Sequence, residues 1–217
     1  MEVILFYTFI SQNKPEEIDT FFRTLPEELR LSISQYQSQK DRQARVLSKF
    51  LTEKLFHQFY PDHQLDWKKL KKDENSKSYL EGYHFNFSSA HSEDLCVVCA
   101  SVNDRCGVDA EILKPLDVSV YKDFLHSEEQ DYLLNGQNSV NDFYNIWIKK
   151  EAVLKASGLG ISKELNEVNT LPDYIQVNDQ NFFANEVFIS ELYKVFIALE
   201  NPSVKISVYN QLAKPHL

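Results

Sequence analysis

Apolar and polar residues follow a helical pattern between residues 139 and 158, SVNDFYNIWIKKEAVLKASG. Apolar residues recur there every three or four positions, which predicts an amphipathic helix. They are Val140, Phe143, Tyr144, Trp147, Ile148 and Leu154. Ser139 is a residue type that caps helix starts, and Gly158 suits a left-handed helix end. We therefore expect one long helix over this stretch.

Shorter apolar runs with a period of two predict strands on both sides of that helix. The expected strands cover residues 3–8, 95–100, 108–113, 174–177, 182–189, 194–199 and 204–209, and residues 84–92 are expected to form a strand that leads into a turn. Further helices are expected at 15–25, 26–35, 40–59, 118–125 and 127–134. The last of them has a capping-box pattern, with Ser127 as the N-cap and Gln130 as its partner. Each half of the chain thus contains a strand, then helices, then strands, and the predicted fold class is α+β.

One stripe of the long helix departs from the amphipathic pattern. Trp147, Glu151 and Lys155 are four residues apart, so they lie along one side of the helix, and Lys150 adjoins them. A carboxylate between two ammonium groups suits a site that holds a metal and an anionic ligand together. A solvated Glu–Lys pair is the simpler interpretation of this spacing alone, because such pairs are common on helix surfaces.

A second group of charges lies in the predicted strand segment CGVDAEILKP, residues 106–115. The alternation places Asp109 and Glu111 on one face, where two carboxylates repel each other unless a cation lies between them. Together with Glu151 they would supply oxygen ligands that suit a hard divalent ion such as Mg²⁺. For Asp109 and Glu111 alone, an edge strand with a solvated charged face is the better explanation.

Composition limits the possible classes of protein. The chain has 217 residues, 43% of them hydrophobic, a net charge of −9 and a pI near 5.2, and this length allows one domain or two small ones. A general nucleic-acid-binding protein would be basic, so this charge argues against one. Cys96, Cys99 and Cys106 are expected to be reduced thiols in the core. The N-terminal segment matches neither a signal peptide nor a membrane span, so a cytoplasmic location is the expectation.

The two charged motifs together resemble a known family. GVDAE at residues 107–111, followed by WIKKEAVLK at residues 147–155, is similar in order and spacing to the double motif of 4′-phosphopantetheinyl transferases of the surfactin-synthetase-activating type. The resemblance implies two similar α+β halves related by a pseudo-two-fold axis, with the active site in the cleft between them. Residues 1–105 would form the side that binds the 3′-phosphate and adenine of coenzyme A, and residues 106–217 would carry the metal and the catalytic helix.

The resemblance also implies a set of ligand-binding residues. The positions that it carries over for coenzyme A are Lys40, Arg45, Lys77, Ser89, His91, Lys150 and Lys155. The planar guanidinium group of Arg45 suits a phosphate dianion. The segment HFNFSSAHS at residues 84–92 departs from the family pattern, because its histidine comes only after Ser89 and Ala90. Either Ser89 or His91 therefore takes the place of the family's ligand-contacting histidine.

The implied reaction transfers 4′-phosphopantetheine from coenzyme A to a serine of an apo acyl or peptidyl carrier protein and releases adenosine 3′,5′-bisphosphate. Mg²⁺ would be held by Asp109, Glu111 and Glu151, and Lys150 and Lys155 would stabilise the leaving phosphate. Asp109, Glu151 and Lys155 would be the catalytic residues. Glu151 would remove the serine proton directly or through a metal-bound water, and the sequence does not decide between these routes. We expect a monomer, because one chain supplies both sides of the cleft, and the carrier stays unidentified.

Two other classes of function compete with this interpretation. A non-catalytic coenzyme A or nucleotide-binding module would keep the basic residues but would have no need of three carboxylates. A scaffold for protein interactions would have no reason to place Asp109, Glu111 and Glu151 at this spacing. We therefore expect an enzyme whose partners include neither nucleic acid nor a membrane.

Overall fold

The computed structural model describes residues 2–136, 139–159 and 165–213, and these form an α+β fold with two four-stranded sheets. The first sheet has the strand order β10-β1-β5-β4 and the second has the order β6-β9-β8-β7. The strands of the first sheet are β1 (Glu2–Phe9), β4 (Asn86–Ser92), β5 (Leu95–Ser101) and β10 (Lys205–Asn210). Those of the second are β6 (Cys106–Ile112), β7 (Ile175–Val177), β8 (Gln180–Glu186) and β9 (Tyr193–Leu199).

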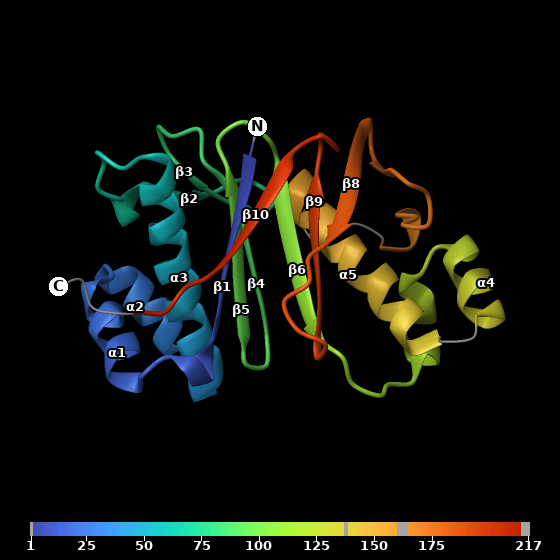
Figure 1. The fold of residues 1–217 in the computed structure, drawn as a ribbon, viewed down its shortest axis with the longest axis horizontal. Coiled ribbons are helices and arrows are strands. Elements are labelled where there is room, and N and C mark those ends of the chain that lie inside the picture. The colour runs from blue at the N-terminus through green and yellow to red at the C-terminus, as the bar shows by residue number, and fades with distance from the viewer. Residues whose placement is uncertain (1, 137–138, 160–164, 214–217) are drawn as a thin grey trace.

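The helices cover the outer faces of the two sheets, as Figure 1 shows. They are α1 (Pro15–Thr24), α2 (Glu27–Ser34), α3 (Gln39–Phe59), α4 (Ser127–Asn135) and α5 (Ser139–Ser157). A small hairpin, β2 (Leu70–Lys72) and β3 (Ser78–Leu80), follows α3. The apolar face of α3 packs on β1, β4 and β5, whereas α5 packs on β8 and β9. A third apolar cluster lies between the sheets and includes Leu5, Cys99, Val108 and Ile197. The core is therefore built in layers of helix, sheet, sheet and helix.

The two halves repeat one topology. In each, a first strand leads to helices, and a later antiparallel pair of strands joins the sheet so that the second strand of the pair lies in the middle. In the first half this gives β1-β5-β4 with α3 before β4, and in the second it gives β6-β9-β8 with α5 before β8. This repetition agrees with the two similar halves that the sequence resemblance implies.

The last strand of the chain returns to the first sheet. Strand β10 pairs parallel with β1, and the backbone N–H of Ala213 donates to the Oδ1 atom of Asn13 at 2.7 Å. A division into residues 1–105 and 106–217 stays a prediction, and β10 crosses that line because it completes the sheet of the other half.

The halves meet where β4 and β6 lie side by side. The side chains of β4 supply acceptors for backbone N–H groups of β6: Ser88 Oγ accepts from Val108 at 3.2 Å, and Ser92 Oγ accepts from Ile112 at 3.1 Å. The thiol of Cys106 also donates to the carbonyl oxygen of Asn86. We call this contact the β4–β6 seam. All three cysteines are buried and free, as the sequence predicts.

Helix α5 lies against β6 at Gly107. A Cβ atom at this position would stand 2.1 Å from the carbonyl oxygen of Ala152 and 2.4 Å from the backbone nitrogen of Ala156. Only a residue without a side chain allows the helix backbone to come so near the strand. This close approach fixes α5 directly over the face of β6 that carries Asp109 and Glu111.

Several sequence predictions hold in detail. The helix expected at 40–59 is α3. Gly158 follows the last residue of α5, and its φ of +77° confirms the predicted left-handed end, where its backbone N–H donates to the carbonyl oxygen of Leu154 at 3.2 Å. The helix expected at 118–125 is a 3₁₀ helix, Val118–Phe124. The capping box of α4 is formed by His126 and Glu129, so the prediction of Ser127 and Gln130 was one residue off. In the part of the chain that the structure describes, no helix has the length and apolarity to cross a membrane.

Replacing Gly107 by alanine tests the close approach of α5 to β6. Gly107→Ala should lower the free energy of unfolding by about 1–3 kcal/mol, because the new methyl group meets helix backbone that cannot move aside alone. Urea denaturation followed by circular dichroism measures this loss. The control is Gly136→Ala, where the nearest atom to the new Cβ is the flexible side-chain Oδ2 of Asp142 at 3.2 Å. Equal losses in the two variants would contradict the proposed constraint.

Candidate active site

Two carboxylates of β6 point toward α5, as the strand alternation predicts. The Oδ1 atom of Asp109 lies 2.7 Å from the Nζ atom of Lys155, and the Oε2 atom of Glu111 accepts a hydrogen bond from Ser92 at 2.7 Å. The other carboxylate oxygen of Asp109, Oδ2, is buried and has no hydrogen-bond partner. Burial raises the pKa of both acids, and the charge of Lys155 opposes the rise.

Glu151 faces the same acids from α5. Its side chain is only 8% exposed, and burial together with the charges of Asp109 and Glu111 raises its pKa to about 7, against the influence of Lys155. Lys155 follows one helical turn later, and its Nζ atom also lies 3.5 Å from the carbonyl oxygen of Ser89 on β4. The structure therefore brings the three predicted acids and Lys155 into one charged cluster beside the β4–β6 seam.

The donor chemistry of this cluster suits a divalent cation. Carboxylate oxygens are the ligands of hard cations, and the unpartnered Oδ2 atom of Asp109 is a buried acceptor that a cation would satisfy. The side chains are not gathered around one point: among the described residues no three His, Cys, Asp or Glu side chains are close enough to hold a metal ion. Lys155 supplies the positive charge next to Asp109 in this arrangement.

Two cavities meet at Ser89 of β4, beside Lys155 of the charged cluster. The first, of about 350 Å³, lies between α3, β4 and α5, and Lys77, Ser89 and Lys155 line it. The second, of about 370 Å³, lies between α2, α3 and β2, and Arg45, Ser89 and His91 line it. Five of the predicted ligand-binding residues thus border these two spaces. Both halves of the protein contribute to the first cavity, which agrees with an active site between them.

Arg45 and His91 stand together in the second cavity. The guanidinium carbon of Arg45 lies 3.6 Å from the ring centre of Tyr36, and its Nε–H is buried without an acceptor. Burial, with the positive charge of Arg45, lowers the pKa of His91. Ser89 and His91 are two residues apart on β4 and line the same cavity, so the structure leaves both available for the ligand-contacting role.

Comparison with known proteins supports the resemblance. Residues 105–206 match the family model of the 4′-phosphopantetheinyl transferase superfamily. The matched residues of this chain include the acid cluster and Lys155. Four other predicted ligand-binding residues precede the matched segment: Arg45, Lys77, Ser89 and His91.

Individual members of the superfamily match over different lengths. The 4′-phosphopantetheinyl transferase gsp of Aneurinibacillus migulanus is 35% identical over 44% of this chain and 40% of its own length. The enzyme Sfp of Bacillus subtilis is 35% identical over 40% of this chain and 38% of its own. The enzyme psf-1 of Bacillus pumilus is 26% identical over 71% of this chain and 67% of its own. The chain thus matches about two fifths of the first two of these relatives.

A solved structure shows a weaker likeness. It is the holo-[acyl-carrier-protein] synthase of Thermotoga maritima, with a TM-score of 0.33 and 16% identity over 43% of this chain and 61% of that protein.

The predicted ligand-binding lysines Lys40 and Lys77 differ in their positions. Lys40 is exposed, borders neither cavity, and pairs instead with Glu93 at 2.6 Å, which raises the pKa of Lys40. Glu93 also pairs with Lys114, so it joins a helix of the first half to the chain after β6. Lys77, in contrast, borders the first cavity and donates to the carbonyl oxygen of Ala156 at 2.8 Å, and burial lowers its pKa.

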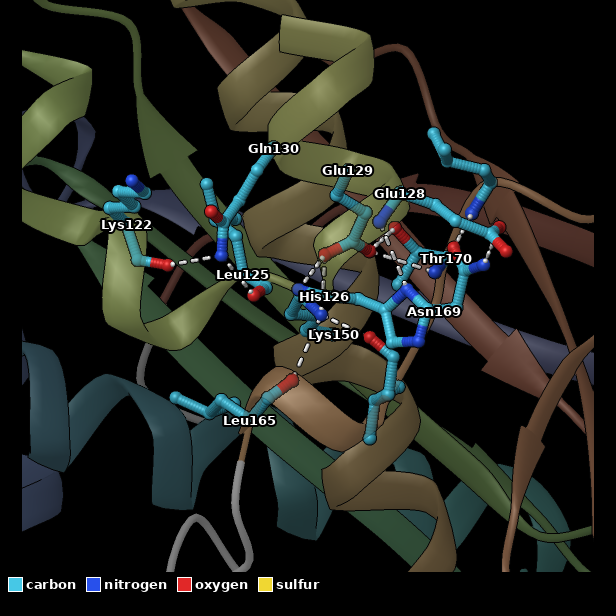
Figure 2. A network of polar contacts seen from close by, with 12 residues as sticks. Lys122, Leu125, His126, Glu128, Glu129, Gln130, Lys150, Leu165, Asn169 and Thr170 are labelled. Atoms are coloured by element: carbon cyan, nitrogen blue, oxygen red, sulfur yellow. Dashed lines mark hydrogen bonds and ion pairs between the residues drawn. The ribbon is translucent and has the colours of Figure 1, made fainter.

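The prediction that Lys150 binds an anionic ligand is wrong. Its side chain is completely buried, and its Nζ atom lies 2.7 Å from the Oε2 atom of Glu129, which is equally buried (Figure 2). The same ammonium donates to the carbonyl oxygens of Leu165, at 2.9 Å, and Val168. Residues 150 and 151 are neighbours on α5, but a helix rotates them to different sides, and only Glu151 faces β6.

Glu129 completes this buried network. Its Oε1 atom accepts hydrogen bonds from the backbone N–H and hydroxyl of Thr170, both at 2.8 Å, and its Oε2 atom accepts from the backbone of His126. Both charges are therefore fully hydrogen-bonded, which is the condition under which a buried ion pair is tolerated. The network attaches α4 and the segment after α5 to α5, so Lys150 has a structural role.

Three basic residues of the cavities were missed by the sequence analysis. Lys49 borders both cavities, and Lys71 and Lys72 border the second. Lys49 was detectable, because it lies four residues after Arg45 and therefore on the same side of the predicted helix. The positions of Lys71 and Lys72 depend on how the β2–β3 hairpin folds back on α3, which no local pattern predicts.

Removing the cation of the buried pair should destabilise the protein. Lys150→Met leaves the carboxylate of Glu129 buried without its counter-charge, so the free energy of unfolding should fall by about 3–5 kcal/mol. The control is Lys40→Met, which removes an exposed ion pair and should cost about 0–1 kcal/mol. Chemical denaturation of both variants provides the measurement. A Lys150→Met variant as stable as the control would show that the pair contributes little.

Glu151 should make stability depend on pH in metal-free buffer. Because its pKa is raised from 4.5 to about 7, the folded protein holds this proton more tightly than the unfolded chain, and stability falls as the pH rises through that window. Glu151→Gln stays neutral, so it should melt at a higher temperature than the wild type at pH 8, with a smaller difference at pH 5. Thermal melting in chelator tests this. Glu28→Gln, exposed on α2, should show no such change, and a pH-independent difference for Glu151→Gln would contradict the expectation.

Proposed function

We propose that this protein transfers the 4′-phosphopantetheine group of coenzyme A to a serine of an apo acyl or peptidyl carrier protein. The observation that carries the proposal is the position of the acid cluster of Asp109, Glu111 and Glu151, because Lys155, which pairs with Asp109, lines the first of two neighbouring basic cavities. A phosphate-rich ligand in the cavities would place its reacting phosphorus near the carboxylates. The superfamily match of residues 105–206 supports the same reaction.

The basic cavities would hold coenzyme A by its phosphates. Arg45 offers a buried N–H without an acceptor, and a phosphate oxygen would satisfy it. Because Arg45 lies in the first half of the chain, we assign it to the 3′-phosphate. Lys77 and Lys155 border the first cavity and would meet the pyrophosphate. Ser89 and His91 face the ligand from β4, and either fulfils the role that the family gives to a histidine.

The transfer itself requires one proton to leave the serine. The serine oxygen attacks the phosphorus that carries pantetheine, the bond from that phosphorus to the bridging oxygen breaks, and adenosine 3′,5′-bisphosphate departs with the electron pair. Glu151, whose pKa is raised to about 7 in the metal-free protein, would accept the serine proton. Lys155 stabilises charge on the departing phosphate. Mg²⁺ bound by Asp109, Glu111 and Glu151 would neutralise pyrophosphate charge.

The partners follow from the same reaction. Coenzyme A is the donor, and a carrier protein presents the serine. A monomer suffices, because β4, α3 and α5 of one chain border the first cavity. A cytoplasmic location stays a prediction. The alternative of a non-catalytic coenzyme A-binding module does not explain why three carboxylates repel one another beside the cavity.

Substitution of the acids tests the proposed reaction. Glu151→Gln keeps the size of the side chain but removes its capacity to accept a proton, so kcat should fall at least ~100-fold. Asp109→Asn should act mainly through the metal, so excess Mg²⁺ or Mn²⁺ should restore part of its activity. The measurement is the mass gain of an apo carrier protein incubated with coenzyme A across a Mg²⁺ titration, with thermal melting alongside.

Two results would contradict this assignment. Turnover of Glu151→Gln near that of the wild type would exclude Glu151 as the base. Full activity in chelator would exclude a role for the metal in the reaction. The control variant Glu28→Gln should transfer at the rate of the wild type. If the wild type transfers no 4′-phosphopantetheine to any of several carrier proteins, the proposed activity is wrong.

A further inference from the structure

Lys49 lies where the two cavities meet. It belongs to α3, one helical turn after Arg45, and it borders both cavities together with Ser78 and Ser89. A ligand that extends from the side of Arg45 to the side of Lys155 would pass this residue. The motifs of the sequence did not single it out.

The surroundings of Lys49 are positively charged. Burial and the charges of Arg45 and Lys72 lower its pKa to about 8. Apart from the phenol of Tyr36, the other titratable groups that border the two cavities are also basic: Lys71 and Lys77 around the β2–β3 hairpin, His91 on β4 and Lys155 on α5. Lys49 therefore keeps its charge at an energetic disadvantage in the free protein.

No carboxylate compensates this charge. The carboxylate nearest along α3 is Glu53, which accepts a hydrogen bond from the indole of Trp67 at 3.2 Å. The Nζ atom of Lys49 lies 5.8 Å from the ring centre of Trp67, and it has no ion pair with any acid in the described segments. A partly buried cation among other cations is unfavourable for folding, and an anion at the junction of the cavities would relieve this.

We propose that Lys49 binds a phosphate group of the ligand that spans both cavities, and that it takes up a proton when that ligand binds. The proposal rests on the proposed function in one respect, which is that coenzyme A is the ligand. Lys49 is then a binding residue that links the 3′-phosphate side of the site to the side of the acids.

The proposal has a consequence for the pH dependence of binding. The bound phosphate stabilises the ammonium form, so binding is tightest below pH 8 and weakens as the pH rises through 8, where free Lys49 loses its proton. At pH 8 free Lys49 is half protonated, so binding should take up at most about half a proton at this residue. His91 contributes little there, because its pKa is lowered from 6.5.

Titration calorimetry in two buffers of different ionisation enthalpy measures the proton uptake at pH 8. The probes are coenzyme A, dephospho-coenzyme A and adenosine 3′,5′-bisphosphate, with the wild type, Lys49→Met and Lys49→Arg. Lys49→Met should weaken coenzyme A at pH 7 by about tenfold or more, which is the size of a charged hydrogen bond, and should remove the part of the proton uptake that Lys49 supplies. Lys49→Arg should keep most of the affinity and lose the same part of the uptake, because arginine stays charged.

The choice of probe identifies the phosphate. If Lys49 contacts the 3′-phosphate, as we propose for Arg45, the effect of Lys49→Met should vanish with dephospho-coenzyme A. If it contacts the pyrophosphate, the effect should persist with that probe. Lys68→Met removes an exposed lysine after α3 and should change neither affinity nor proton uptake. Lys49→Met should also melt no lower than the wild type, because it removes a poorly compensated charge.

The outcomes separate this proposal from the proposed function. Binding of coenzyme A by Lys49→Met within about twofold of the wild type, or an unchanged proton uptake, overturns the role of Lys49 even if transfer to carrier proteins is observed. Lys49-dependent binding and uptake in a protein that transfers nothing support the role of Lys49 and overturn the transferase activity. A wild type that binds none of the three probes overturns both.

Discussion

The site depends on the close approach of α5 to β6 at Gly107. Because that residue has no side chain, the backbone of the helix comes within contact distance of the strand, and the next turns of α5 then hold Glu151 and Lys155 over Asp109 and Glu111. A larger residue at 107 would push the helix outward along its length and open the acid cluster to water. The distances in the cluster, its burial and the raised pKa of Glu151 all follow from this packing constraint.

Opposite charges occupy the two sides of the β4–β6 seam. The carboxylates belong to the second half, and the basic residues Arg45, Lys49 and Lys77 belong to the first. Burial raises the pKa of the acids and lowers the pKa of Lys49 and Lys77, and like charges nearby add to the shifts of Glu151 and Lys49. Lys155 contacts both sides, through Asp109 and through the backbone of Ser89. Such a separated arrangement favours a ligand with several phosphates and the metal that accompanies them.

Neighbouring residues of α5 serve different ends. Glu151 stays near the cavity with a carboxylate that can gain or lose a proton, whereas the ammonium of Lys150 is permanently engaged by Glu129 and two backbone carbonyls. The buried pair attaches the segment after α5 and helix α4, and so supports the helix that carries the active residues. Lys150 therefore stabilises the fold and Glu151 serves the active site, because neighbouring residues of a helix point in directions about 100° apart.

The sequence by itself determined the elements and the acid cluster. Periodicity identified α3, α5 and β6, and the alternation of β6 with the four-residue spacing on α5 placed Asp109, Glu111, Glu151 and Lys155 on the correct faces, because these relations are local. The same local patterns misplaced Lys150 and Lys40 and missed Lys49. They also could not show that β10 returns to β1. Only the tertiary structure decided those points. Periodicity states which residues share a face, but whether that face meets solvent, a buried acid or a cavity depends on elements distant in the chain, and the energy of a charge depends on that environment.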